Sequence, residues 1–274
     1  MTIQAPAKVN LVLRILAKRA DGYHDIETLM APISLADEIE ITVSDGGGMD
    51  FQCDHPDLPV GPENLVWRAV EVFRKETGAR FHAKIFLRKR IPHGAGLGGG
   101  SSDAAAVLNA LNHLLNTCLG FQALEAMAAK IGSDIPFFIR SRPALCCGRG
   151  ELIQDAAALP KTELLLLKPP FPVSTAWAYK AWSARKKSSD SAGCRQQYHA
   201  GIELINDLEE PVFGKHLLLP AMKSWLLEQD EVAAAMMSGS GSTLFAILRQ
   251  DAGTLAGRAK ERFGAELWTQ HSII

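Results

Sequence analysis

The chain has 274 residues, a formal net charge of −1, 47% hydrophobic residues and 22% charged residues. This length allows one large domain or two small ones, and the composition is typical of a globular protein. The near-neutral charge argues against a broad nucleic-acid interface, which needs a basic excess. No apolar run reaches the roughly 18 residues of a membrane helix. We therefore expect no nucleic-acid partner and no membrane association.

The chain contains five cysteines at irregular spacing, without a C-x-x-C pair. This pattern fits neither a disulfide framework nor a zinc site. The start of the chain also lacks a basic segment followed by an apolar one, which a signal peptide would have. These features predict reduced thiols and a cytoplasmic location.

The first half of the chain alternates between strand and helix patterns. Strict alternation of apolar and polar residues predicts strands, and apolar residues at helical spacing predict helices. A turn is expected at Asp21-Gly22, a loop at 46–48, and a helix-capping glycine at Gly78. The predicted strands are 8–16, 38–43 and 81–88, and the predicted helices are 63–77, one that starts near Ser102-Asp103, and 124–131.

The second half contains a short apolar run at 163–168, which predicts a fully buried strand. The polar stretch 185–193 is expected to be a solvated loop. Helices are predicted near 203–209, 221–236 and 254–263, with a strand at 243–248. Because strands and helices do not alternate regularly, an α+β fold is favoured, with a boundary near 155–162.

Residues 92–103 read P-H-G-A-G-L-G-G-G-S-S-D and lie between a predicted strand and a predicted helix. Glycines let the backbone turn its N–H groups inward, and the N-terminus of a helix attracts anions. Arg88, Lys89 and Arg90 add positive charge just upstream. The segment is therefore interpreted as a phosphate-binding loop, with a flexible linker as the alternative.

Two other phosphate-binding patterns fit this loop less well. The Walker pattern fails because no lysine follows the glycines. The dinucleotide pattern G-x-G-x-x-G is met by Gly94, Gly96 and Gly99. However, the region about 20 residues further on, where an acidic residue should end a strand, reads as helix. A dinucleotide-dependent oxidoreductase and a non-catalytic nucleotide-binding module remain as alternatives.

The loop resembles the phosphate-binding loop of the GHMP small-molecule kinases. Further stretches resemble the same family and occur in the family's order. They are P-A-K-V-N-L at 6–11, R-A-D-G-Y-H at 19–24, G-S-D-I-P-F-F at 132–138, N-D-L-E at 206–209 and M-S-G-S-G-S-T-L-F at 237–245. The resemblance therefore spans nearly the whole chain.

The resemblance implies a two-domain α+β fold. Residues 1–155 would form a ribosomal-protein-S5-like N-terminal domain, and 156–274 a ferredoxin-like C-terminal domain. The implied activity is ATP-dependent phosphorylation of a hydroxyl on a small molecule that carries a cytidine diphosphate group. Another GHMP kinase, of the homoserine or mevalonate type, is the alternative. Mg²⁺ is implied together with ATP, without a dedicated metal site, and the protein is expected to be a monomer or a weak homodimer.

The resemblance also assigns roles to individual residues. Lys8 and Asp134 would be catalytic, with Asp134 as the base and Lys8 as the cation that orients the hydroxyl. Substrate contacts would come from Asn10, Tyr23, His24 and the turn Gly239, Ser240 and Gly241, with Tyr179 as a candidate for the second wall around the cytosine. ATP would bind Pro92, His93, Gly94, Ala95, Gly96, Leu97, Gly98, Gly99, Gly100, Ser101 and Ser102.

Overall fold

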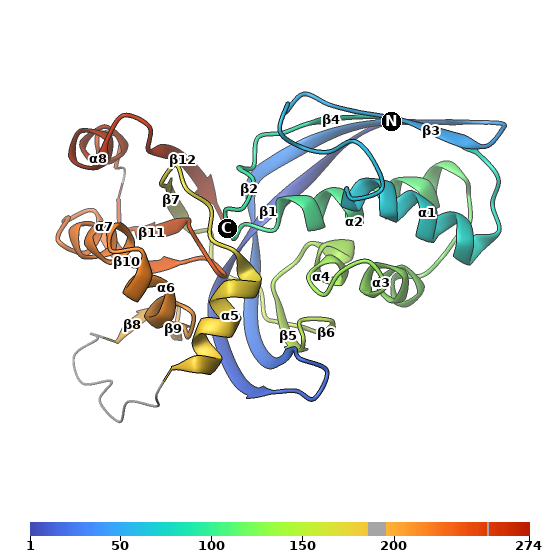
Figure 1. Cartoon of the computed structure of the whole chain (residues 1–274). Coiled ribbons are helices and arrows are strands. Elements are labelled where there is room, and N and C mark those ends of the chain that lie inside the picture. Colours follow the sequence, from blue (N-terminus) through green and yellow to red (C-terminus); the bar gives the residue numbers. More distant parts are fainter. Residues whose placement is uncertain (186–195, 251) are drawn as a thin grey trace.

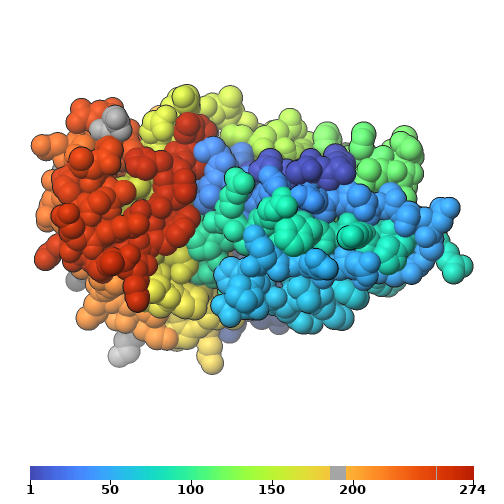
Figure 2. Space-filling view, turned by 90° about the horizontal axis from the view of Figure 1, so that it is seen from above, coloured from blue at the N-terminus to red at the C-terminus, as the bar shows by residue number. Residues whose placement is uncertain are grey.

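The computed structural model describes residues 1–185, 196–250 and 252–274, and it forms two α+β units. Figure 1 shows the units side by side, with the long N-terminal strands between the helices of the first unit and the sheet of the second. The space-filling view in Figure 2 shows the same two lobes from above. The predicted α+β class is confirmed.

The first sheet is organised around a long antiparallel hairpin, β1 (Thr2–Lys18) and β2 (His24–Ser44), which the Asp21-Gly22 turn connects. Gly22 has φ +87°, which a residue without a Cβ adopts without strain. The strand order is β3-β4-β2-β1-β9-β8, and β5 and β6 extend β2. The remaining strands are β3 (Gly48–Cys53), β4 (His82–Arg88), β5 (Ala144–Gly148), β6 (Leu152–Asp155), β8 (Gln197–His199) and β9 (Ile202–Asn206).

Four helices cover one face of this sheet (Figure 1). They are α1 (Leu65–Thr77), α2 (Gly99–Leu114), α3 (Phe121–Ala129) and α4 (Ile135–Arg140). The apolar stripes predicted for α1 and α2 are buried, including Phe73 and Leu108. The Asn64 side chain caps α1, and Gly78 ends it with φ +69°, as its position in the sequence predicts.

The second unit is built on the sheet β10-β11-β7-β12. Strand β7 lies between two neighbours, which explains why its apolar run is buried throughout. The strands are β7 (Glu163–Lys168), β10 (Val232–Met237), β11 (Leu244–Leu248) and β12 (Trp268–Ile273). The helices are α5 (Thr175–Ala184), α6 (Glu209–Lys215), α7 (Leu218–Leu227) and α8 (Leu255–Phe263).

Of two predicted helices of the second half, one is wrong and the other is correct only in its first part. Residues 202–206 form β9, which pairs in parallel with β1, and α6 begins only at Glu209. In the segment 221–236, α7 ends at Leu227 and the alanine-rich residues 232–237 form β10. Pairing with β11 and burial outweigh the helix preference of alanine in this segment. The predicted loop 185–193 lies, apart from Arg185, outside the described residues.

Among the helices that the structure describes, none combines the length and the apolar character that crossing a membrane requires.

Candidate active site

A cavity of about 1020 Å³ lies where the two units meet. It is lined by β1, β2, the glycine-rich loop, the start of α4, helix α5 and the turn before β11. The structure therefore brings together residues from both ends of the chain. The predicted site residues that line it are Lys8, Asn10, Tyr23, His24, Pro92–Gly100, Ser101, Asp134, Tyr179, Gly239 and Ser240. Ser102 and Gly241 are buried just behind this lining.

The glycine-rich loop turns through residues with positive φ at Gly94, Gly96 and Gly98. Helix α2 begins at Gly99, earlier than the start predicted near Ser102-Asp103, because Gly98 serves as its cap. A Cβ on Gly98 would lie 2.7 Å from Cζ of Phe138. No side chain caps this helix, so its first N–H groups are free to bind an anion.

The loop packs directly on the turn 238–243 of the second unit. The Gly96 carbonyl accepts a hydrogen bond from Ser238 Oγ at 3.0 Å, and Thr243 N–H donates to the Ala95 carbonyl at 3.2 Å. A Cβ on Gly96 would lie 2.2 Å from the Ser238 carbonyl oxygen. Only glycine allows this approach of two backbones, and it joins the two glycine motifs into one wall of the cavity.

Lys8 and Asn10 share one face of β1, as their spacing predicts, and both are buried. Lys8 Nζ donates to Asn10 Oδ1 at 2.5 Å and to the Gly96 carbonyl at 2.7 Å. Asn10 Nδ2 donates to Thr28 Oγ1 at 2.8 Å, and the Thr28 hydroxyl donates to the Val12 carbonyl at 2.6 Å. Thr28 therefore fixes the Asn10 amide so that its oxygen faces Lys8.

Asp134 lies half-buried at the start of α4, and its charge acts on Lys8. Burial lowers the pKa of Lys8 to about 8, and the nearby Asp134 carboxylate partly opposes this shift. A Cβ on Gly150 would lie 3.4 Å from Asp134 Oδ1, so the β5–β6 turn approaches this carboxylate closely. The predicted pair of a cation and a carboxylate is thus brought together beside the glycine loop.

The other end of the cavity is aromatic. The His24 ring stacks on Tyr179 with centroids 5.2 Å apart and meets Trp182 edge-on at 5.7 Å. His24 Nε2 lies 2.6 Å from Ser183 Oγ. Tyr23 is half-exposed, and the Arg149 guanidinium lies 5.1 Å from its ring centre. Flat rings from the β1–β2 hairpin and from α5 therefore lie at this end of the cavity.

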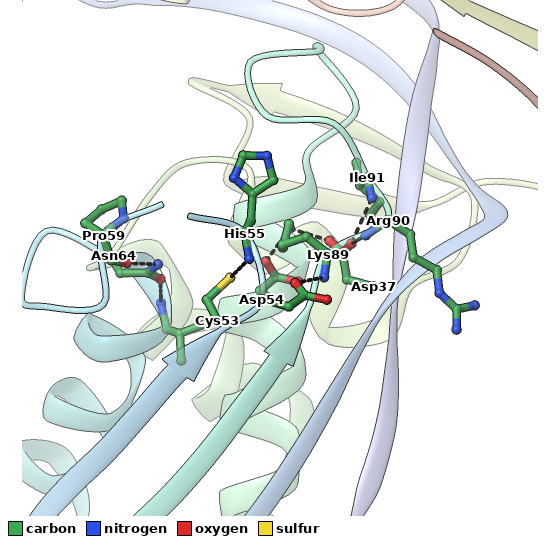
Figure 3. A network of polar contacts seen from close by, with 11 residues as sticks. Asp37, Cys53, Asp54, His55, Pro59, Asn64, Lys89, Arg90 and Ile91 are labelled. Carbon is green, nitrogen blue, oxygen red and sulfur yellow. Dashed lines mark hydrogen bonds and ion pairs between the residues drawn. The ribbon is translucent and has the colours of Figure 1, made fainter. Parts of the chain in front are cut away.

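The basic run upstream of the loop does not supply the free positive charge that its sequence suggests. Arg88 pairs with Glu38 and Glu40, and the Arg90 side chain is exposed and points away from the cluster in Figure 3. Lys89 is buried between Asp37 and Asp103. Arg88 and Lys89 are therefore paired and Arg90 faces away, which leaves the helix N-terminus and Lys8 as the positive groups beside the loop.

Figure 3 shows how Asp37 organises this cluster. Asp37 Oδ1 accepts hydrogen bonds from the backbone N–H groups of Arg90 at 2.6 Å and Ile91 at 2.8 Å, and Oδ2 pairs with Lys89. Burial, reinforced by Asp37, raises the pKa of Asp103 to about 8 against the opposing effect of Lys89. The strand that leads into the glycine loop is therefore held by one buried carboxylate.

Thr28, Ser183 and Asn206 are site residues to which the sequence motifs give no role. Asn206 Nδ2 donates to the Met237 carbonyl at 2.7 Å and the Gly239 carbonyl at 2.8 Å, and its Oδ1 accepts from Leu208 N–H at 3.0 Å. The N-D-L-E motif pointed to Asn206 without indicating this contact. Thr28 and Ser183 belong to no motif, so only the structure identifies them.

In the part of the chain that the structure describes, no group of three or more His, Cys, Asp or Glu side chains is arranged to hold a metal ion. Ser102 Oγ, in the first turn of α2, is buried without a hydrogen-bond partner. Among the described residues of the loop segment 92–102, it is the one buried hydroxyl without a partner.

The two glycine motifs and the two-unit α+β architecture define a small-molecule kinase. The family model "GHMP kinases N terminal domain" matches residues 64–142, and "GHMP kinases C terminal" matches residues 195–265. The chain belongs to the GHMP kinase family, which confirms the resemblance in its motifs, and it is an ATP-dependent small-molecule kinase.

Within this family, the chain is similar to enzymes named 4-diphosphocytidyl-2-C-methyl-D-erythritol kinase. The relative from Methylacidiphilum infernorum is 45% identical over 90% of this chain and 86% of its own length. The relative from Synechococcus sp. (strain JA-3-3Ab) is 41% identical over 90% of this chain and 84% of its own.

Solved structures agree with this relationship. A crystal structure of 4-(cytidine 5'-diphospho)-2C-methyl-D-erythritol kinase covers all of this chain and 98% of its own, with a TM-score of 0.80 and 33% identity. Homoserine kinase from Cytophaga hutchinsonii shares the fold, with a TM-score of 0.66 and 20% identity over 93% of its own chain.

Proposed function

We propose that this protein uses ATP to phosphorylate the 2-hydroxyl of 4-diphosphocytidyl-2-C-methyl-D-erythritol, a step of non-mevalonate isoprenoid biosynthesis. The observation that carries the proposal is that one cavity contains the glycine loop, the Lys8–Asp134 pair and the aromatic end around His24. The names of the relatives agree with this substrate.

In this proposal, the ATP phosphates bind the loop 92–102. The free N–H groups at the start of α2 supply hydrogen bonds and the positive end of the helix dipole. The nucleoside of ATP lies toward Asn64, Leu65 and Ile91, which line the cavity beyond the loop. The γ-phosphoryl group then faces Lys8, whose Nζ already touches the loop at the Gly96 carbonyl.

Asp134 accepts the proton of the substrate 2-hydroxyl as its oxygen attacks the γ-phosphorus. The new P–O bond forms, the bond to the β–γ bridging oxygen breaks, and ADP leaves. Lys8 in its charged form holds the hydroxyl and offsets developing negative charge. This division of labour suits phosphoryl transfer, which depends on positioning and charge stabilisation.

The cytosine of the substrate binds at the aromatic end. Tyr23 and Tyr179 offer flat surfaces for stacking, and His24 reads the polar edge of the base. Asn10 contacts the substrate beside Lys8, and Gly239, Ser240 and Gly241 contact its phosphates from the second unit. Ser240 is held in place by a 2.8 Å contact between its hydroxyl and that of Thr175.

Mg²⁺ enters with ATP in this proposal. Mg²⁺ usually keeps several waters and uses few protein ligands beside nucleotide phosphates, and Ser102 Oγ is an unpaired oxygen that fits such a role. When bound, the ion neutralises phosphate charge. We further propose that the enzyme acts in the cytoplasm as a monomer or weak homodimer, without a nucleic-acid partner.

The experiment is ADP release with 4-diphosphocytidyl-2-C-methyl-D-erythritol, set against homoserine, mevalonate and galactose. Turnover of the cytidine substrate alone is expected. Turnover of another substrate instead would assign the chain to a different GHMP kinase. NAD binding that ATP does not displace would favour an oxidoreductase, and ATP binding without any turnover would favour a non-catalytic module.

The roles of the central pair are tested by Lys8→Ala and Asp134→Asn. Each variant is expected to abolish turnover and to keep ATP affinity close to that of the wild type, because the phosphates bind mainly to backbone N–H groups. Asn109→Ala serves as a control, because Asn109 donates only to the Ile139 carbonyl, away from the cavity. Near-normal rates in either variant would remove the assigned roles.

A further inference from the structure

We propose that Ser183 fixes the tautomer of His24 and thereby makes the pocket prefer a pyrimidine with an amino group at C4 over one with a carbonyl there. This inference rests on the proposed function for its substrate. Ser183 would be a positioning residue that acts through His24 and sets base specificity.

Ser183 stands one turn after Tyr179 near the end of α5, and its Oγ has two partners. It donates to the Tyr179 carbonyl at 3.1 Å, and it lies 2.6 Å from His24 Nε2. A carbonyl can only accept, so the single hydroxyl hydrogen is used there, as is common for serines in helices. Ser183 Oγ then accepts, and His24 Nε2 carries the hydrogen.

A neutral imidazole with its hydrogen on Nε2 has a bare Nδ1, which is an acceptor. Burial and the positive charge of Lys18 lower the pKa of His24, which favours this neutral form. Stacking on Tyr179 and edge contact with Trp182 hold the ring in place. In the described part of the chain, Nδ1 has no hydrogen-bond partner, so it remains available to a ligand.

Cytosine carries an amino donor at C4, whereas uracil carries a carbonyl acceptor there. An acceptor nitrogen on His24 forms a hydrogen bond with the amino group of cytosine, and it repels the carbonyl of uracil. His24 and Ser183 both line the cavity, so the residue that sets the tautomer lies in the same pocket as the residue that contacts the base. Without the Ser183 hydroxyl, His24 could present either tautomer and accommodate either base.

The tautomer is measured directly by long-range ¹H–¹⁵N NMR of the full chain labelled with ¹⁵N-histidine, with His24 assigned by a His24→Asn variant. The wild type is expected to show hydrogen on Nε2. Ser183→Ala should shift the signals toward a tautomer mixture, and Ser183→Thr should restore the wild-type pattern. Hydrogen on Nδ1 in the wild type, or an unchanged spectrum in Ser183→Ala, would overturn the proposal.

Specificity is measured as the ratio of kcat/KM for the cytidine substrate to that for its uridine analogue. Ser183→Ala is expected to reduce this ratio at least about tenfold, which corresponds to the net free energy of one hydrogen bond. Ser183→Thr is expected to keep the ratio. An equal loss on both substrates would indicate a merely structural role and would contradict the inference.

Ser174→Ala is the matched control in the same helix. Ser174 Oγ accepts from Trp177 N–H at 3.3 Å and caps α5, so its loss should lower stability without changing the ratio. A changed ratio in this control would assign the specificity to α5 as a whole. If the wild type phosphorylates neither nucleotide, the proposed function fails, whereas the NMR result still decides the tautomer of His24.

Discussion

At the scale of single residues, the site depends on ionisable groups whose surroundings differ from water. Lys8 is buried and loses hydration, and Asp103 is buried beside a second carboxylate. These shifts come from neighbours that are distant in the sequence. They lead to predictions for the pH dependence of turnover, for the pH dependence of stability and for variants of Asp37 and Asp103.

The first prediction concerns the pH dependence of turnover. Burial lowers the pKa of Lys8 to about 8 in the free protein, so Lys8 loses its charge as the pH rises through this value. If the charged form acts, kcat/KM should fall above pH 8. The measurement is a pH profile of kcat/KM for ATP, which reports the ionisation of groups in the protein before ATP binds. An alkaline limb that begins only above about pH 10, the ordinary value for lysine, would contradict the prediction.

The lowered pKa of Lys8 has a consequence for stability with a definite sign. Between pH 8 and 10.5 the unfolded chain holds more protons at Lys8 than the folded chain does. The contribution of Lys8 to the free energy of unfolding therefore increases with pH across this window. Urea unfolding of the wild type and Lys8→Met should show a difference that moves in favour of the wild type over this range. A constant difference would contradict the shift.

The second prediction concerns the two carboxylates around Lys89. Asp37→Asn removes the charge partner of a buried lysine and should cost about 3 kcal/mol of unfolding free energy. Burial beside Asp37 raises the pKa of Asp103, and only one oxygen of Asp103 has a hydrogen-bond partner, so Asp103→Asn should cost less than about 1 kcal/mol. Urea unfolding at pH 7 measures both. Equal costs would contradict this assignment of charge.

At the scale of elements, the site depends on backbones that approach each other closely. The loop before α2 and the turn before β11 meet at Gly96, whose positive φ and neighbours exclude a side chain. The sequence indicated glycine motifs at both positions. It did not indicate that one packs on the other, because the contact joins residues 142 positions apart.

The third prediction tests this contact. Gly96→Ala should force the two backbones apart, since its Cβ would lie 2.2 Å from the Ser238 carbonyl oxygen, and should raise the KM for ATP at least about tenfold. Gly100→Ala is the control for stability. Its Cβ would lie 3.6 Å from Leu65 Cδ1, an ordinary contact in a helix. Gly100→Ala should keep the unfolding midpoint of the wild type. A similar decrease of the midpoint in both variants would contradict the prediction.

Errors in the predicted elements also arose at this scale. Apolar periodicity described α1, α2 and β7 well, because each buries a face that its own sequence defines. It was wrong for 203–206 and 232–236, where β9 and β10 pair with β1 and β11. Strand formation there depends on distant pairing and not on local preference.

At the scale of the whole molecule, one sheet crosses the proposed division of the chain. The division into residues 1–155 and 156–274 stays a prediction. Strand β9, from the second half, pairs with β1 in the first sheet, and Asn206 at its end holds the turn that carries Gly239. The Asn206 amide therefore connects β9, in the sheet of the first unit, with the turn of the second unit at the substrate end of the cavity.

The fourth prediction tests these hydrogen bonds of Asn206. Asn206→Ala leaves the carbonyls of Met237 and Gly239 without their buried donor, which should cost about 2 kcal/mol of unfolding free energy. It should also raise the KM for the cytidine substrate, because Gly239 borders Lys8 and Asn10. Asn109→Ala loses one hydrogen bond in the first unit and should lower stability without changing KM. An unchanged KM in Asn206→Ala would show that the turn is held by other contacts.

The sequence by itself determined the family, the glycine loop and the identity of many residues that line the cavity. These features are local, because the backbone freedom of glycine and the alternation of a strand are properties of consecutive residues. Only the tertiary structure decided that Lys89 is neutralised, that Thr28 orients Asn10, and that Ser183 meets His24. Each of these depends on side chains from distant segments, whose charges and hydrogen bonds are paired only when the chain folds.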